Sequence, residues 1–287
     1  MHWVMRALSL VGSFLMLAAC DAPCTGCEDV DAGRASVDAA GTDGSLVDAA
    51  ALDAARVDGA APELDAGARP RRVLVFTRTA GFRHSSIGPG YDAIEAELAT
   101  LSISAERSEE LSALTDDNLA RFAAVVFLST TGDVLDSDAE GALQRYVEGE
   151  GGWVGIHAAA DCEYEWPWYR TLVGALFARH PAVQSASLVV EDGTHPATVH
   201  LPMRWDRTDE WYDFRTNPRS EVEVLITIDE STYSGGGMGA DHPMAWAHEV
   251  GAGRSFYTAL GHTDASYGEP LFREHLRRAI VWAARLE

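Results

Sequence analysis

The chain has 287 residues, with 22 basic and 44 acidic side chains and a formal net charge of −22. Every one of these basic residues is arginine. The absence of lysine excludes Schiff-base and pyridoxal-phosphate lysines as well as the P-loop lysine. The acidic balance argues against nucleic acid as a partner, because basic residues that neutralise phosphates supply much of that affinity. Hydrophobic residues make up 47% of the chain, enough for the packed core of one or two domains.

Residues 1–19 are predicted to be a lipoprotein signal peptide. One positive charge, Arg6, precedes an apolar run over 7–17 that is too short to span a bilayer. The run ends in Leu17-Ala18-Ala19-Cys20, which resembles the lipobox of bacterial lipoproteins and implies lipidation of Cys20. An ordinary secretory signal is the alternative. We therefore expect a protein anchored in the bacterial cell envelope by lipid, facing the periplasm or the surface.

Residues 20–70 are predicted to form a disordered acidic stalk. A Val/Leu-Asp-Ala/Gly theme recurs at irregular spacing, no aromatic residue is present, and residues 21–70 carry a net charge of −8. Such a segment cannot bury enough apolar surface to offset chain entropy. Cys24 and Cys27 form a Cys-x-x-Cys pattern without a strand–helix context, so a local disulfide or free thiols are favoured over a redox motif.

Residues 71–287 are predicted to be one α/β domain. Apolar runs predict strands at 72–77, 103–106, 123–128, 153–156, 188–191, 223–228 and 255–260. Helical spacing predicts helices over 91–101, from Asp136 to the glycines at 149–152, and over 271–286. Alternating strands and helices indicate a mainly parallel sheet with helices on both faces, and ligands bind such sheets at the carboxyl ends of the strands.

Three histidines come after predicted strands: His84 lies in the loop after the first strand, and His157 and His262 lie at the ends of the strands at 153–156 and 255–260. A parallel sheet would bring them to one edge although they are far apart in the sequence. Each alone is more often a hydrogen-bonded structural residue, but three at one edge favour a shared functional site. Imidazoles titrate near neutrality and also bind zinc, so this edge suits acid–base work or metal ligation.

His157 occupies a position resembling a nucleophile elbow. In Gly155-Ile156-His157-Ala158-Ala159, small residues flank the place where serine or cysteine would act as nucleophile. Asp161 follows four residues later and would share a helical face with His157, as a second metal ligand or a partner of the ring. Asp161 could equally be a helix cap. Cys162 is interpreted as a packing residue.

The domain resembles the ThuA-like (trehalose utilisation) family over nearly all of residues 72–285. The matching segments are Gly81-Phe82-Arg83-His84, Thr130-Thr131-Gly132, 152–161, Trp166-Pro167-Trp168-Tyr169, 173–181, His195-Pro196, Asp209-Glu210-Trp211-Tyr212, Asp241-His242-Pro243 with Trp246, and Gly261-His262-Thr263. The resemblance implies a flavodoxin-like fold similar to class I glutamine amidotransferases. The resemblance also implies that His157 occupies the place of the elbow cysteine of those enzymes, so the chain would not be a Cys- or Ser-nucleophile amidotransferase. It also implies a link to trehalose and related sugars.

Further polar and aromatic residues fit a sugar site. Asp209 or Glu210 could serve as general base or metal ligand, or could only anchor Arg207 or Arg215. Tryptophans could stack on sugar faces, although buried tryptophans more often belong to the core. The candidates are Trp166, Trp168, Trp211 and Trp246. His180, His195 and His242 precede prolines and are interpreted as mainly structural, with His180 and His242 also candidates for the site.

The resulting hypothesis is an enzyme, a hydrolase or an isomerase, that acts on sugars or oxidised sugar derivatives. The predicted catalytic residues are His157, His262 and Glu210; the predicted substrate-binding residues are Arg83, His84, Thr131, Trp168 and Trp211. A divalent metal such as zinc would be held by His157, Asp161 and His262. The alternative is a non-catalytic carbohydrate-binding module that uses the same residues.

Overall fold

The computed structural model describes residues 69–287. The predicted signal peptide, the lipidation site at Cys20, Cys24 and Cys27, and the stalk up to residue 68 lie outside the described residues. None of the helices within 69–287 is both long enough and apolar enough to span a membrane.

A nine-stranded sheet runs through the middle of the fold in the order β2-β1-β3-β4-β11-β10-β9-β6-β7. Its first five strands are mutually parallel. They are β2 (Ser104–Ser108), β1 (Arg72–Phe76), β3 (Ala124–Leu128), β4 (Gly152–Ile156) and β11 (Gly253–Thr258). Strands β3 and β4 are buried along their whole length, as their unbroken apolar runs predict.

The remaining four strands run antiparallel to their neighbours. They are β10 (Pro243–Val250), β9 (Glu223–Ile228), β6 (Gln184–Val190) and β7 (Arg204–Asp209). A separate two-stranded sheet pairs β5 (Phe177–Arg179) with β8 (Asp213–Phe214). The sequence predicted the parallel half, β9 and the end of β6, but it did not predict β5, β7, β8 and β10.

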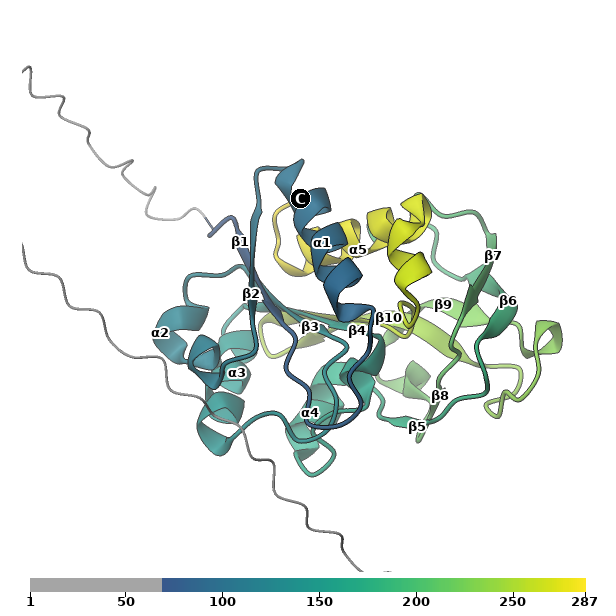
Figure 1. Cartoon of the computed structure of the whole chain (residues 1–287), viewed down its shortest axis with the longest axis horizontal. Coiled ribbons are helices and arrows are strands. Elements are labelled where there is room, and N and C mark those ends of the chain that lie inside the picture. Colours follow the sequence, from purple (N-terminus) through teal and green to yellow (C-terminus); the bar gives the residue numbers. More distant parts are fainter. Residues whose placement is uncertain (1–68) are drawn as a thin grey trace, which may run out of the picture. The chain divides into compact units, whose positions relative to one another are not determined.

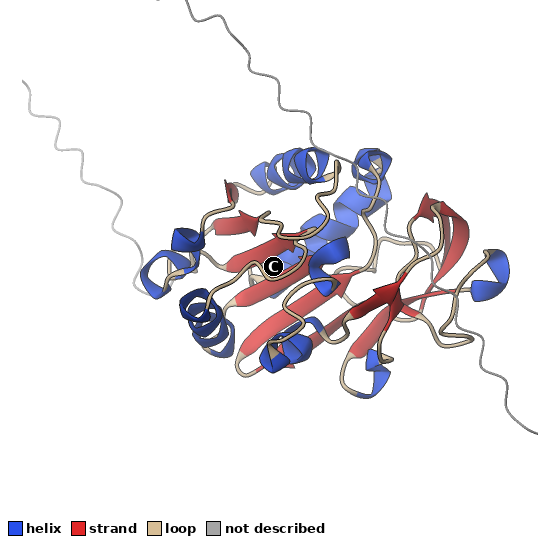
Figure 2. Ribbon diagram, turned by 60° about the horizontal axis from the view of Figure 1, so that its bottom comes forward, coloured by secondary structure: helices blue, strands red, loops and turns tan. Residues whose placement is uncertain are grey.

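Helices cover both faces of the sheet (Figures 1 and 2). On one face α1 (Ile87–Ala99) packs beside α5 (Pro270–Ala283). On the other lie α2 (Asp116–Leu119), α3 (Ser137–Glu148) and α4 (Pro167–Val173). Short 3₁₀ turns are η1 (Leu111–Leu114), η2 (His157–Ala160), η3 (Pro218–Ser220), η4 (Glu230–Thr232) and η5 (Asp264–Gly268). The arrangement confirms the predicted α/β fold with helices on both faces.

The termini of the helices follow local sequence signals. The carboxylate of Asp136, where the helix was predicted to start, accepts a hydrogen bond from the amide of Ala139 at 2.9 Å and so caps α3. Gly149 follows the last residue of that helix. The closing helix is shorter than the predicted span of 271–286, beginning at Pro270 and ending at Ala283.

Candidate functional site

His157 stands immediately after β4, in a sharp turn at the carboxyl edge of the sheet. Its φ angle is +52°, in the left-handed region that residues other than glycine rarely adopt. The turn continues as the one-turn helix η2. The structure therefore gives His157 the backbone geometry of a nucleophile elbow, with an imidazole in place of the usual nucleophile.

Three more side chains meet His157 at this edge, from the loop after β1, the end of β7 and the end of β11. Ligand atoms of His84, His157, Glu210 and His262 all lie within 4.8 Å of one another. We call these four residues the histidine–glutamate cluster. The three histidines converge as the parallel sheet predicts, and Glu210 reaches them from the antiparallel half.

Hydrogen bonds fix the orientation of the rings. Nδ1 of His157 donates to the carbonyl oxygen of Ala259 at 2.8 Å, which leaves Nε2 with its lone pair. That Nε2 lies 3.1 Å from Nδ1 of His262 and 3.5 Å from Oε2 of Glu210. The same Oε2 lies 3.2 Å from Nδ1 of His262. The other oxygen of Glu210, Oε1, is 2.9 Å from Nδ1 of His180, a side chain that is 42% exposed.

The electrostatics of the cluster keep one histidine neutral and the glutamate ionised. Burial, reinforced by the nearby His157 and His262, lowers the pKa of His84 to about 3. Burial alone would raise the pKa of Glu210, but the nearby imidazoles of His157 and His262 outweigh it and lower this pKa to about 2. The hydrogen bond to Glu210 raises the pKa of His262. At neutral pH, His84 therefore offers a lone pair on one ring nitrogen and Glu210 a negative charge.

The donor set fits a divalent metal of the zinc type. Zinc ligands at their usual bond lengths lie about 3.3 Å apart around a tetrahedron. The separations among His157 Nε2, His262 Nδ1 and Glu210 Oε2 are 3.1, 3.2 and 3.5 Å. A buried Nδ1 of His84 has no hydrogen-bond partner. The carbonyl of Ala259 orients the ring of His157, as second partners of metal-ligating histidines do.

Asp161 lies at the end of η2 and not among the ligand atoms around His157. It ends η2 as the C-cap residue, and its Oδ1 accepts a hydrogen bond from the hydroxyl of Tyr164 at 2.6 Å. It does not belong to the group of ligand atoms around His157. The 3₁₀ turn is too short and too tight to place the two side chains on one α-helical face. The predicted ligand set of His157, Asp161 and His262 is thus replaced by one in which Glu210 and His84 join the two histidines.

Cys162 is a packing residue, as predicted. It is a free cysteine with no exposed surface, and burial raises the pKa of its thiol. A thiol in this state is a poor nucleophile.

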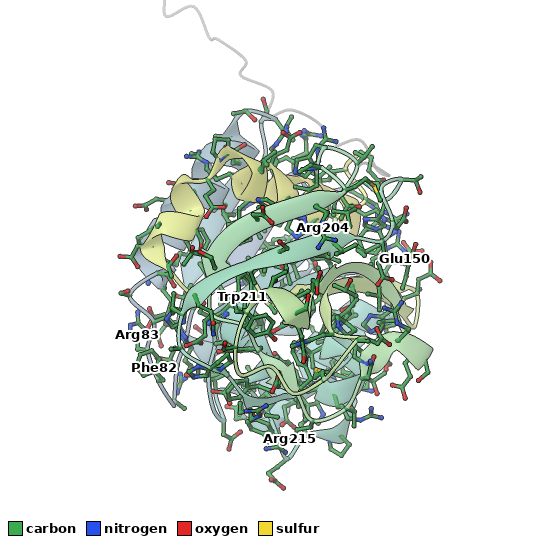
Figure 3. The ribbon with its side chains drawn as sticks, turned by 90° about the vertical axis from the view of Figure 1, so that its right-hand side faces the viewer. Phe82, Arg83, Glu150, Arg204, Trp211 and Arg215 are labelled. Atoms are coloured by element: carbon green, nitrogen blue, oxygen red, sulfur yellow. The ribbon has the colours of Figure 1, made fainter. Side chains whose placement is uncertain are left out.

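Arg83 and Thr131 act on the loop before His84 rather than on the cluster itself. The guanidinium of Arg83 forms an ion pair with Glu109 at 2.6 Å. The hydroxyl of Thr131 donates to the carbonyl oxygen of Phe82 at 2.7 Å. Between them Phe82 remains 67% exposed, at the edge of the molecule beside Arg83 (Figure 3). Its ring lies 4.8 Å from that of His84, edge to face.

The two tryptophans predicted to bind substrate have other partners. Trp211 is fully buried, and its indole nitrogen donates to the carbonyl oxygen of Gln184 at 2.9 Å. Trp168 is partly buried, packs on Trp166 and donates to Glu148 at 2.8 Å. Trp211 is therefore a core residue in this structure, because no face of its ring is open to a ligand.

Sequence reasoning missed Phe82 as a member of this region and treated His180 as mainly structural. An aromatic residue two positions before a site histidine was the available sequence signal for Phe82. His242 instead belongs to a second group with Asp213 and Glu230. There Oε1 of Glu230 accepts hydrogen bonds from the amides of Met238 and Gly239, both at 2.8 Å. The same oxygen lies 2.8 Å from Nδ1 of His242. Protein donors thus already occupy this carboxylate.

Comparison with known proteins relates the chain to a family. Residues 72–283 match the family model described as ThuA: Trehalose utilisation. A ThuA-like protein of Bacteroides uniformis shares 23% identity over 75% of this chain and 92% of its own, with a TM-score of 0.63. A ThuA-like protein of Parabacteroides merdae shares 21% over 76% and 91%, with a TM-score of 0.64. No curated protein matches the chain.

A more distant structural match is a β-galactosidase of Bacillus circulans sp. alkalophilus. It shares 14% identity over 76% of this chain and 32% of its own, with a TM-score of 0.51. At this identity the match concerns the fold alone. It agrees with the mainly parallel α/β architecture described above.

Proposed function

The chain belongs to the ThuA (trehalose utilisation) family, and we propose that it acts on a sugar or an oxidised sugar derivative through the histidine–glutamate cluster. The observation that carries this proposal is the meeting of three imidazoles and a carboxylate at one edge of the sheet. His262 is 25% exposed on its side chain, so the cluster is open to a substrate from that side. The reaction class that we propose is hydrolysis or isomerisation.

His157, Glu210 and His262 are proposed to hold and move protons. His157 keeps a lone pair on Nε2 because its Nδ1 proton is committed to Ala259. Glu210 is ionised and contacts both rings, so it can stabilise an imidazolium that forms beside it. A sugar hydroxyl or carbonyl beside these atoms would meet a base and an acid held in fixed positions.

As an alternative to proton transfer by these side chains, a divalent metal, with zinc as our proposal, would be held by His84, His157, Glu210 and His262, which would then act as ligands. Bound there, it supplies Lewis-acid polarisation of a substrate oxygen or a lowered pKa for a coordinated water. The neutral state of His84 at physiological pH suits this role, because a metal ligand must present an unprotonated nitrogen.

The exposed ring of Phe82 favours a sugar over a fully polar substrate. It stands beside His84 on a loop that Thr131 and the Arg83–Glu109 pair fix in place. Sugar rings carry apolar C–H faces that pack on aromatic rings, so this side chain is proposed to contact the substrate.

Metal analysis and turnover assays of the purified protein test the proposal. We expect the wild type to bind zinc stoichiometrically and to convert trehalose, another disaccharide or an oxidised form of one of them. The variants His157→Ala and His262→Ala should lose both properties, whereas His195→Ala, a buried histidine outside the cluster, should keep them. Sugar binding without turnover would favour a carbohydrate-binding module. A wild type with neither metal nor sugar affinity would overturn the proposal.

We further propose that Cys20 anchors the protein in the cell envelope through lipid. The support is the sequence Leu17-Ala18-Ala19-Cys20 after a short apolar run. Cells fed labelled palmitate should incorporate the label into the wild type but not into Cys20→Ser, which should appear in the soluble fraction. An unlabelled wild type would favour an ordinary secretory signal.

A further inference from the structure

Asp209, the last residue of β7, contacts two members of the histidine–glutamate cluster through their backbones. It has no exposed surface. Its Oδ1 accepts hydrogen bonds from the amides of Glu210 and His262, both at 3.0 Å. Its Oδ2 accepts the amide of Gly261 at 2.8 Å. One carboxylate thus ties the end of β7 to the turn after β11.

Arg207 balances the charge of this buried carboxylate. Its side chain is almost completely buried, and Nη2 of its guanidinium lies 3.1 Å from Oδ2 of Asp209. The guanidinium packs between the rings of Trp205 and Phe272, at 4.8 and 4.6 Å from their centres. Burying a carboxylate costs free energy unless it is paired, and Arg207 supplies the pair. Both oxygens of Asp209 accept hydrogen bonds from the amides at 210, 261 and 262.

The turn that Asp209 holds is itself tightly constrained. Gly261 has a φ of +106°, and a Cβ atom at this position would lie 2.8 Å from the hydroxyl of Tyr267. Two residues earlier, the carbonyl of Ala259 fixes the ring of His157. The 259–262 segment therefore contacts His157 through Ala259 and Glu210 through His262. Asp209 adds a backbone link between this segment and Glu210.

We propose that Asp209, balanced by Arg207, is the positioning residue that sets the spacing between Glu210 and His262. This inference rests on the proposed function in that it takes the cluster as the reacting centre. Asp209 touches no ring or carboxylate of the cluster by hydrogen bond; it acts through the backbone of its neighbours. A displacement of the turn would lengthen the 3.2 Å distance between His262 and Glu210. It would also disturb the ligand geometry that a metal requires.

The variant Asp209→Asn tests this in the full chain with two readouts. Asparagine keeps the volume but replaces one accepting oxygen by a donor, so one side of the carboxylate loses its partners. Hydrogen exchange at the amides of Glu210, Gly261 and His262 should become about tenfold faster or more. Affinity for cobalt(II), used as a spectroscopic probe of the cluster, should fall about 10- to 100-fold, with a changed d–d spectrum.

Asp213→Asn is the matched control. Asp213 is also buried, pairs with Arg179 at 2.6 Å and accepts the amide of Gly237, but it lies outside the cluster. This variant should lower stability without changing cobalt affinity or exchange at residues 210, 261 and 262. If Asp209→Asn does not fold, Ser266→Ala removes a hydroxyl that contacts both Asp209 and Arg207 and should give smaller changes of the same kind.

The outcomes separate this inference from the proposed function. Unchanged exchange at Gly261 and His262 in Asp209→Asn would overturn the inference, and so would equal losses of cobalt affinity in Asp209→Asn and Asp213→Asn. A wild type that binds no cobalt would remove the metal centre from the proposed function. The exchange rates of the three amides would then still decide whether Asp209 holds the turn.

Discussion

His157 joins an unfavourable backbone conformation to a fully determined side chain. A left-handed φ costs a residue other than glycine roughly 1–2 kcal/mol. Three contacts hold it there: its Nδ1 donates to Ala259, its carbonyl accepts the hydroxyl of Tyr257 at 2.7 Å, and its ring packs on Tyr212 at 4.4 Å. Strain that persists under such constraint is a common property of functional sites. These contacts hold the imidazole of His157 in one orientation, with Nε2 directed at the cluster.

Phe82 offers a residue-scale test of substrate contact. In Phe82→Ala the loop keeps its anchors at Thr131 and Glu109, so only the ring is lost. Removing one aromatic contact of about 1 kcal/mol should raise KM for the sugar substrate about fivefold, with little change in kcat. Phe82→Tyr should restore the wild-type KM. Steady-state kinetics on the substrate found for the wild type provides the measurement.

Met203→Ala serves as the control for this prediction. Met203 is 65% exposed, close to the value for Phe82, and it precedes β7 rather than the loop of His84. Its loss should leave KM unchanged. Equal KM values for Phe82→Ala and the wild type would show that the ring does not contact the substrate.

At the scale of secondary-structure elements, the sequence predicted best where one physical signal dominates. The strands β1, β3 and β4 are buried on both faces, so they read as unbroken apolar runs. The start of α3 follows from Asp136 as its cap and its end from Gly149. These signals are local, and tertiary contacts do not alter them.

The elements that sequence analysis missed derive their stability from partners far away in the chain. Strand β7 has the sequence RWDRTD and looks like a surface segment, yet Trp205, Arg207 and Asp209 all face inward. Its two buried charges neutralise each other, which a linear sequence does not show. The central strand β10 has only a short apolar run, and its neighbours β9 and β11 decide its place in the sheet.

The same distinction explains the candidate site. His84, His157 and His262 follow parallel strands, so their convergence could be derived from the expected topology alone. Glu210 follows an antiparallel strand at the far end of the sheet order, and its contact with His262 depends on Asp209. The role suggested for Asp161 required an α-helix after β4, but a single 3₁₀ turn forms there.

Across the whole molecule, buried titratable groups give stability two opposing dependences on pH. Burial lowers the pKa of His275 to about 3, and burial raises the pKa of Glu163 to about 7. Between its native value and its usual 6.5, His275 binds a proton only in the unfolded chain, so its contribution is complete above pH 6.5 and is lost as the pH falls. Glu163 has the opposite sign: between its usual 4.5 and about 7 the native state binds the extra proton, so stability falls as the pH rises.

The variant His275→Gln should isolate the first dependence. His275 is fully buried on α5 and donates from Nδ1 to the carbonyl oxygen of Ala197 at 2.7 Å, a bond that an amide can replace without titrating. When the pH is lowered from about 7.5 to about 5, the unfolding free energy of the variant should rise by about 2 kcal/mol relative to that of the wild type.

Urea unfolding at the two pH values measures this difference, and Glu163→Gln supplies the control of opposite sign. The carboxylate of Glu163 accepts the amides of Val134 and Leu135 at 2.7 and 3.0 Å, and the oxygen of glutamine can keep these bonds without a charge. The unfolding free energy of that variant, relative to the wild type, should therefore be higher above pH 7 than at pH 5. If the difference between His275→Gln and the wild type does not change with pH, His275 is not held neutral by burial, because only a neutral native imidazole penalises the folded state in acid.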